Sequence, residues 1–591
     1  MGAAQNIEFS PTRAFLDVDS SLTGRRWRAP DPARMRAAEA LAQSSGRPLA
    51  LCSLLARAGV PAPEVAAYLA PSLRDLLPDP RGLRDVETAA QRLNRAVAGR
   101  ERIAIFADYD VDGGASAALL LGWLAARGQD ATLYVPDRID EGYGPNDAAM
   151  ARLGAGHGLI VCVDCGTLSH RPVAAAGPAD VIVLDHHLGG ETLPPAVAVV
   201  NPNRQDENGE LGHLCAAAVV FLVLVEANRQ LRDAGQTGPD LMSMLDLVAL
   251  ATVADVAPLT GVNRAFVRQG LKVMARRQRP GLVALADAAG LDAAPASHHL
   301  GFVLGPRINA GGRVGAADLG ARLLATADLS EAAALAQRLE QLNAQRREVE
   351  TAVRHAALAQ AEARGLQAPL VWAAGEGWHP GVVGIVAARL KEAANRPAIV
   401  IGIDNGVAKG SGRSVSGIDL GASIQRLAAE GLIEKGGGHK MAAGLTLGQD
   451  QIEPAMARLS ELLEKQGAHR LGNGELPLDG LLMTAAATTD LIEMLDIAGP
   501  FGAGAPAPRY AFAAQRISSA RPVGDGHLKL TLGDGTGPAL DAIAFNVGGT
   551  ELGDALTRHG GAAFHVAGRL ELNHWRGRTR PQLRLEDAAR A

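Results

Sequence analysis

Five short apolar segments within residues 102–200 constrain the fold of this chain more than any other feature. Several are nearly continuous runs of Ala, Val, Ile and Leu, which is typical of parallel strands covered by helices on both faces. Helical segments separate them, the first running from about Ser116 to Arg127. The alternation predicts βαβ units in a doubly wound α/β sheet. The predicted strands cover residues 102–107, 131–135, 159–163, 180–184 and 196–200.

Acids and histidines follow three of these strands at their carboxyl ends. In an open parallel sheet, ligands bind just outside those ends, so the three groups are expected at one edge. Clustered carboxylates repel one another unless a cation neutralises them, and this ligand set suits Mn²⁺ or Mg²⁺. A single acid after a strand is usually only a polar residue with no chemical role. Acids at three strand ends together favour a site for two metal ions, which is typical of phosphoester hydrolysis. The residues are Asp108, Asp110, Asp112, Asp164, Asp185, His186 and His187.

Three other patterns need separate interpretations. Asp255 interrupts the apolar segment 248–259, where an acid must be paired or metal-bound, so helix capping, a salt bridge and metal binding all stay open. Cys162 and Cys165 have C-x-x-C spacing, but no second pair exists and Asp164 between them better fits the metal cluster. The pair His298-His299 has no preceding strand and no neighbouring Asp, so we expect surface or loop histidines.

The second half of the chain predicts one long helix and two further folded parts. A helix is expected from Asp328 to Arg364, with Asp328 and Glu331 as a capping box and Gly365 as its stop. It is either a packed bundle helix or a spacer, and the second α/β pattern that follows, with strands at 369–374 and 398–402, favours a spacer. Five later segments with Gly-rich turns predict a small OB-like barrel. They are residues 509–517, 527–532, 540–545, 564–572 and 582–585.

Composition excludes several classes of protein. The 591 residues carry 58 Lys and Arg against 63 Asp and Glu, which rules out a uniformly basic nucleic-acid binder but not a local basic groove. Four cysteines are too few for a disulfide scaffold, so a reducing compartment is expected. The first residues lack a secretory signal, and the most apolar stretch, Leu214–Val225, is too short to span a membrane and predicts a buried helix. We therefore expect a soluble, cytoplasmic protein.

An ordered set of motifs resembles a known family. The segments 108–116, 163–166 and 185–187 resemble the motifs of DHH phosphoesterases. The segments 247–259 and 307–313 narrow the resemblance to the RecJ exonucleases. The segments 378–385, 410–414 and 436–444 resemble the DHH-associated domain, and 499–504 resembles the start of the family's OB-fold. The resemblance runs from about residue 47 to the C-terminus.

The resemblance implies an activity and a division of the chain. The activity is 5′→3′ hydrolysis of single-stranded DNA to nucleoside 5′-monophosphates, in bacterial DNA repair and recombination, with two Mn²⁺ or Mg²⁺ ions. Single-stranded DNA is the implied partner, with a single-strand-binding protein and a helicase as further candidates and no membrane. The expected parts are an irregular segment 1–46, a catalytic domain 47–300 with a helical N-terminal part, a linking segment and long helix 301–366, a DHH-associated domain 367–467 and an OB-fold nucleic-acid-binding domain 468–591.

The resemblance also implies roles for individual residues. Asp164 would bridge the two ions, and His187 would contact substrate phosphate or the attacking water. Some DHH enzymes carry a histidine where this chain has Phe106, which cannot ligate, and Asp108 is a candidate to compensate. The implied metal ligands are Asp110, Asp112, Asp164, His186 and Asp255.

The implied substrate contacts combine glycine-rich loops with side chains that suit phosphate oxygens. Arg138 would meet a phosphate, whereas Tyr143 either stacks on a base or packs locally. Arg307, Ser411, Arg413 and His439 would bind the 5′-phosphate and the backbone. The barrel would hold the strand without reading its sequence.

Two alternatives remain at this point. One is a DHH phosphodiesterase of short oligonucleotides or cyclic dinucleotides, and the barrel and the long helix argue against it. The other is an inactive DHH scaffold protein, which should have lost metal carboxylates, whereas this chain keeps every acid of the cluster.

Overall fold

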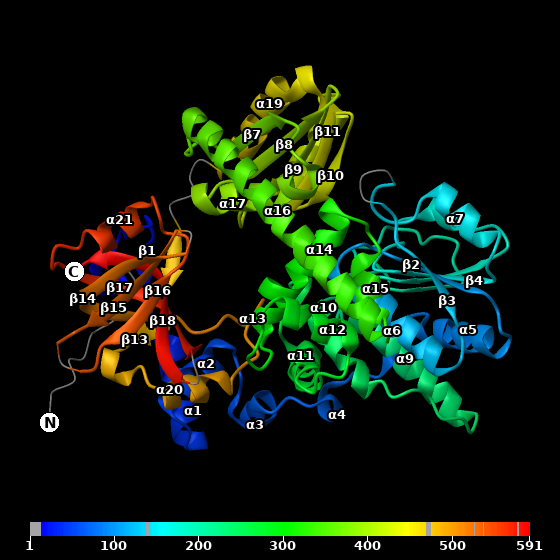
Figure 1. Cartoon of the computed structure of the whole chain (residues 1–591), viewed down its shortest axis with the longest axis horizontal. Helices are drawn as coiled ribbons and strands as arrows, with labels where there is room; N and C mark the ends of the chain where they lie inside the picture. The colour runs from blue at the N-terminus through cyan, green and yellow to red at the C-terminus, as the bar shows by residue number, and fades with distance from the viewer. Residues whose placement is uncertain (1–12, 138–140, 469–473, 525, 536, 576–577) are drawn as a thin grey trace. The chain divides into compact units, whose positions relative to one another are not determined.

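The computed structural model (Figure 1) describes residues 13–137, 141–468, 474–524, 526–535, 537–575 and 578–591. The chain forms two compact units, and each is described by itself. One unit is Ser72–Leu471, which holds the two α/β lobes. The other combines Met1–Pro71 with Gly472–Ala591 and holds the barrel.

The first lobe is built on a five-stranded, fully parallel sheet in the order β3-β2-β4-β5-β6. Helices α7 (Asp147–Gly154) and α8 (His170–Ala174) pack on one face through a core that includes Phe106. Helices α5 (Val86–Ala98), α6 (Val111–Ala126) and α9 (Ala216–Asp233) also contact the sheet. The predicted doubly wound α/β lobe is therefore confirmed. The strands are β2 (Ile103–Ala107), β3 (Ala131–Tyr134), β4 (Leu159–Val163), β5 (Asp180–Leu184) and β6 (Ala198–Val200).

A helical layer follows the sheet. Residues Ala216–Leu224 of α9 are all buried, as expected of the apolar stretch in the sequence. Among the described residues, no single helix is long and apolar enough to cross a membrane, and Leu49–Arg57 with Ala62–Leu69 meets that test only as a pair bent by 108°. The further helices are α10 (Leu245–Ala254), α11 (Gly261–Met274), α12 (Pro280–Ala288), α13 (Ser297–His299), α14 (Gly305–Val314) and α15 (Leu319–Ala325).

The long helix α16 (Leu329–Arg364) both packs and connects (Figure 1). It contacts α12, α14 and α15 of the first lobe and α17 and β7 of the second. Asp328 caps it by accepting from the Glu331 backbone N–H at 2.8 Å. Only this half of the predicted capping box forms, because the Glu331 carboxylate instead binds Thr326 and Arg322.

The second lobe contains a mixed sheet in the order β10-β11-β9-β8-β7, in which only β7 and β8 run parallel. Three of its strands were not predicted, because glycine is depleted in strands and supplies two of seven residues in β9, three of five in β10 and two of seven in β11. The strands are β7 (Val371–Glu376), β8 (Ala398–Asp404), β9 (Val407–Arg413), β10 (Lys435–His439) and β11 (Ala442–Gly448). The helices are α17 (Pro380–Ala394), α18 (Leu420–Ala429) and α19 (Ile452–Lys465).

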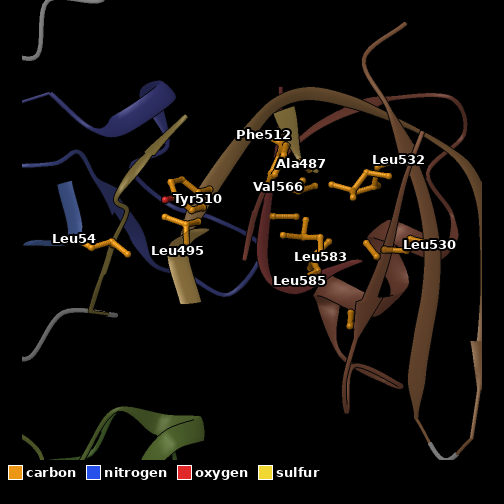
Figure 2. Close-up of a cluster of buried hydrophobic side chains, with 14 of the residues drawn as sticks. Leu54, Ala487, Leu495, Tyr510, Phe512, Leu530, Leu532, Val566, Leu583 and Leu585 are labelled. Atoms are coloured by element: carbon orange, nitrogen blue, oxygen red, sulfur yellow. The ribbon is translucent and has the colours of Figure 1, made fainter. Parts of the chain in front are cut away.

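The other unit contains a six-stranded sheet that closes into a barrel of five strands, because β14 pairs with both β15 and β17. Figure 2 shows part of its core, where Phe512, Leu530, Val566 and Leu583 come from four strands. All five predicted strands form, and the longest extend well beyond the predicted ranges. They are β14 (Tyr510–Val523), β15 (His527–Gly533), β16 (Leu540–Ala544), β17 (Ala563–Trp575) and β18 (Arg578–Arg590), with the short β13 (Gly480–Leu481) beside β14.

The prediction of an irregular segment over residues 1–46 is wrong for its described part. Strand β1 (Arg26–Arg28) pairs with β12 (Glu475–Pro477), and residues Pro32–Ser45 form helix α1. Helix α1 buries only Ala38 and Leu41, so its sequence carries almost no apolar period. Helix α2 (Leu49–Arg57) joins the barrel core through Leu54, so residues up to Pro71 group with the barrel and not with the first lobe.

We expect the barrel core to dominate the stability of its unit. Phe512 is fully buried, whereas Phe545 of the same barrel is 40% exposed. Phe512→Ala should lower the free energy of unfolding of this unit by about 3–5 kcal/mol. Phe545→Ala is the matched control, with a loss below about 1 kcal/mol. Native-state hydrogen exchange of β14–β18 measures both, and equal losses would contradict this packing.

Candidate metal centre

Seven acidic and imidazole side chains converge at the carboxyl edge of the parallel sheet. They come from the ends of β2, β4 and β5 and from the residue that ends α10, Asp255. Three overlapping groups have ligand atoms that all lie within 4.8 Å of one another. The groups are Asp108, Asp110 and Asp164; Asp112, His186 and Asp255; and Asp164, His186 and His187.

Asp164 lies at the centre of this cluster. It belongs to two of the three groups, and its Oδ1 atom is 3.3 Å from His186 Nε2. That oxygen is buried and accepts no hydrogen bond from any described residue. Its backbone is left-handed, with φ of 59°, a conformation that a non-glycine residue adopts at a cost. A buried, unsatisfied oxygen shared by two ligand groups fits a bridging position between two cations.

Helix N-termini hold two of the other carboxylates. Asp110 is the N-cap of α6, and its Oδ1 accepts from the backbone N–H groups of Asp112 and Gly113. Asp112 accepts from the backbone of Ala216 and Ala217 at the start of α9, at 2.7 and 2.8 Å. The positive end of each helix dipole therefore stabilises one carboxylate and fixes its orientation.

The electrostatics of the cluster favour a bound cation. Burial, followed by the charges of Asp112, Asp110, Asp108 and Asp185, raises the pKa of Asp164 well above its usual value. Burial also raises the pKa of Asp112, despite the nearby His186 imidazole. The same causes raise the pKa of Asp255 to about 8. Divalent cations would supply the missing positive charge, and carboxylate oxygens with imidazole are ligands that Mn²⁺ and Mg²⁺ accept.

Asp185 is a site residue whose role sequence reasoning missed. Its Oδ1 accepts from His187 Nδ1 at 2.8 Å and from the His186 backbone N–H at 2.8 Å. Its Oδ2 accepts from the backbone N–H and the hydroxyl of Thr167. Although burial opposes ionisation, these hydrogen bonds hold the pKa of Asp185 below its usual value. The bond to Asp185 likewise raises the pKa of His187, against the effect of burial.

Two asparagines complete this support. The Asn201 amide donates to the His187 carbonyl and the Thr167 hydroxyl, both at 2.8 Å. The Asn203 amide donates to the His186 carbonyl at 2.6 Å. Both residues follow β6, so the pattern of polar residues after strands would have found them.

Phe106, Asp108, the two cysteines and the His298-His299 pair were also singled out in the sequence. Phe106 is fully buried and packs against Tyr134, whereas Asp108 lies in a ligand group with Asp110 and Asp164, as its suggested compensating role requires. Burial raises the pKa of both the Cys162 and Cys165 thiols, and neither joins a ligand group within the described chain. His298 and His299 are likewise absent from every group found among the described residues.

The predicted substrate contacts divide between the lobes. Arg138 lies outside the described residues. The Tyr143 hydroxyl donates to the Asp164 carbonyl at 3.0 Å and lies 3.2 Å from His187 Nδ1, so this residue belongs to the metal centre. Arg307 forms an ion pair with Glu340 of α16 and donates to the Val303 carbonyl.

Ser411, Arg413 and His439 lie together on the second lobe. Strand register places Arg413 of β9 and His439 of β10 on either side of Ala442 of β11. Arg413 also donates to the Ser411 hydroxyl at 3.1 Å. The structure therefore brings a guanidinium, a hydroxyl and an imidazole to one face of this sheet.

Comparison with known proteins places the chain in a family. Family models match the DHH family N-terminal domain over residues 102–252, the DHHA1 domain over 366–465 and the RecJ OB domain over 478–587. A curated single-stranded-DNA-specific exonuclease RecJ from Dickeya dadantii is 40% identical over 537 residues, which cover 87% of this chain and 92% of that protein. The chain belongs to the RecJ family. The RecJ of Escherichia coli is 38% identical over 88% of this chain and 93% of its own length.

Solved RecJ structures agree with this assignment. The crystal structure of RecJ in complex with Mn²⁺ from Thermus thermophilus matches with a TM-score of 0.78 and 30% identity, covering 96% of this chain and 79% of that one. The complex of the same protein with Mg²⁺ matches with a TM-score of 0.71 at 29% identity, covering 96% of this chain and 78% of that one. The family resemblance of the motifs and the predicted fold class are both confirmed.

Cation binding should depend steeply on pH. A carboxyl whose pKa is raised keeps its proton in the EDTA-treated protein, up to about pH 8 for Asp255. A cation must displace that proton, so Mn²⁺ affinity should rise about tenfold per pH unit for each proton released, and the contribution of Asp255 should level off above about pH 8. Titration calorimetry in buffers of different ionisation enthalpy counts the protons. Binding without proton release at about pH 6.5 would contradict the raised pKa values.

Asp185 should matter through the histidines that it orients. Asp185→Asn removes the charge that stabilises protonated His187, and we expect a loss of nuclease turnover of about 10- to 100-fold. The alkaline limb of the pH–rate profile should also shift to lower pH, because the pKa of His187 falls and the protonated ring that donates to phosphate is lost earlier. Asp180, at the other end of β5 and paired with Arg92, offers the matched control Asp180→Asn. Similar losses in both variants would show that Asp185 only stabilises the strand.

Proposed function

We propose that this chain is a 5′→3′ exonuclease specific for single-stranded DNA, which releases nucleoside 5′-monophosphates with the aid of two Mn²⁺ or Mg²⁺ ions. The observation that carries the proposal is the set of three ligand groups that overlap at Asp164 and His186. The names of the curated RecJ relatives support the substrate, and the metal-bound RecJ structures support the ions.

The residues at the sheet edge would divide the chemistry between them. Divalent cations, when bound, activate water by lowering its pKa and neutralise charge on the phosphate. Asp164 would bridge the two ions. The other ligands would be Asp110, Asp112, His186 and Asp255, with Asp108 filling the position left by Phe106.

His187 would act on the substrate and not only on the metal. Its Nδ1 atom donates to Asp185, and the Tyr143 hydroxyl lies 3.2 Å from Nδ1 and 3.3 Å from Nε2. Because Asp185 raises the pKa of His187, the protonated ring can donate a hydrogen bond to a phosphate oxygen. Asp185 is therefore a positioning residue, because its two oxygens accept hydrogen bonds from His186, His187 and Thr167.

The second lobe would bind the 5′ end. Ser411, Arg413 and His439 offer a hydroxyl, a guanidinium and an imidazole to the 5′-phosphate. Arg307 would contribute only by sharing its guanidinium between Glu340 and the strand. Arg138 stays in the proposal on the family resemblance alone.

The domains of the chain would divide the work on the strand. The catalytic, linking, DHH-associated and OB parts would keep the roles that their family motifs imply, with the barrel holding the strand beyond the cut. The protein would act in the bacterial cytoplasm, in DNA repair and recombination. There it would contact a single-strand-binding protein or a helicase. The barrel favours a polymeric substrate over the short-oligonucleotide alternative, and the complete carboxylate cluster disfavours an inactive scaffold.

A time course on end-labelled single strands tests the proposal. The wild-type protein should release mononucleotide at once from a 5′ label with Mn²⁺ or Mg²⁺, and not with EDTA. Asp164→Asn keeps the shape and tolerates the left-handed backbone, yet turnover should fall more than about 100-fold, beyond the range of outer-shell partners. Hydrolysis confined to dinucleotides would favour the phosphodiesterase, and cation binding without any hydrolysis would favour the scaffold.

A further inference from the structure

Three strands of the second lobe share one face, which helix α17 borders where Gly384 approaches Ser411 of β9. The register aligns Lys409 of β9, Thr446 of β11 and Lys435 of β10 in a single row. The next row on the same face is Ser411, Gly444 and Gly437, and the third is Arg413, Ala442 and His439. Alternate residues such as Ala408, Gly412, Ala443 and Leu445 are buried on the other face.

The two glycines of the middle row have no structural reason to be glycine. A Cβ at Gly437 would meet nothing within 4 Å, and one at Gly444 would approach only the Gly410 carbonyl oxygen, at 3.9 Å. Neither has a backbone that disfavours other residues, since neither φ lies in the left-handed range. Their effect is to keep the floor of this face bare, so that a ligand can approach the strand backbone closely.

The outer row carries two lysines without protein partners. Both side chains are exposed, and neither forms an ion pair or a side-chain hydrogen bond in the described part of the chain. They stand two strands apart, about 10 Å between backbones. A cavity of about 640 Å³ is lined by Lys409, Lys435, Thr446 and Ser411, and by Tyr143 of the metal centre.

We propose that Lys409, Lys435 and Thr446 form a second anion subsite, which takes the outer phosphates of a 5′-terminal polyphosphate. This inference rests on the proposed function, in which the neighbouring Ser411 and Arg413 hold the first 5′-phosphate. Adjacent rows are about 7 Å apart, a distance that the four-carbon stem of a lysine spans. The enzyme therefore accepts single strands that begin with a triphosphate as well as those that begin with a monophosphate.

The chemistry at the metal centre is unchanged for such a strand. Water adds to the phosphorus between the first two nucleotides, and the bond from that phosphorus to the 3′ oxygen of the first nucleotide breaks. The 3′ oxygen takes a proton, and the first nucleotide leaves as a nucleoside 5′-triphosphate. The shortened strand keeps a 5′-monophosphate, which the Ser411 and Arg413 site then holds.

The backbone phosphates of the strand are a second kind of anion that the two lysines could bind. A lysine that contacts the backbone stabilises every strand equally, whereas one that contacts a terminal polyphosphate acts only on strands that carry it. Strands of one sequence with a 5′-hydroxyl, 5′-monophosphate or 5′-triphosphate therefore separate the two sources.

The test uses the full chain and two readouts. Affinity for the three strands is measured by fluorescence anisotropy in EDTA, where no cleavage occurs, and the first product is identified by anion exchange with Mn²⁺. The wild type should bind the triphosphate strand at least as tightly as the monophosphate strand and release intact nucleoside triphosphate. The Lys409→Gln/Lys435→Gln double variant should lose about tenfold or more on the triphosphate strand and less than about threefold on the other two. Lys465→Gln, at the end of α19, is the matched control.

Two other outcomes would contradict the proposed anion subsite. Equal losses on all three strands would assign the lysines to the backbone and overturn the proposal, as would no loss on any strand. Arg413→Ala separates the premise from the inference, because it should remove the preference for a 5′-monophosphate over a 5′-hydroxyl. If that preference survives while the lysine effect appears, the 5′-phosphate assignment fails and the anion subsite stands alone.

Discussion

Repulsion among buried carboxylates at one sheet edge is the interaction on which the site depends. Asp164 lies in a cluster with Asp108, Asp110 and Asp112, and the raised pKa of Asp164 records how unfavourable full ionisation is without a counter-charge. The fold offsets part of this cost by aiming the N-termini of α6 and α9 at two of the acids. Bound cations would offset the remainder of this cost.

A parallel sheet is what makes such crowding compatible with folding. Strands β2 and β4 are buried and apolar along their length, and β5 is so after Asp180, so the clustered acids lie beyond the last residue of each strand and not within the sheet core. Rigid strand ends hold the ligands, while Asp185, Asn201 and Thr167 hold the histidines through the next layer of hydrogen bonds. This arrangement keeps the ligand geometry independent of the loops around it.

Sequence reasoning succeeded where one physical signal dominated. Apolar runs located the strands of the first sheet and the barrel, and Asp328 located the start of α16. It failed where the signal was absent: the glycine-rich strands β9–β11 have little strand propensity, and α1 buries too few residues to show a period. Local sequence patterns do not predict that Arg307 pairs with Glu340, because the two residues are distant in sequence. They also do not predict that Asp185 orients His187, because this role depends on side-chain geometry.

The central claim is that this carboxylate edge is built for two cations sharing Asp164. Anomalous diffraction from crystals of this protein soaked in Mn²⁺ tests it most directly. The account predicts two peaks, one among Asp108, Asp110 and Asp164 and one among Asp112, His186 and Asp255, bridged by the Asp164 carboxylate. A single peak, or a pair that leaves Asp164 without a metal contact, would contradict it.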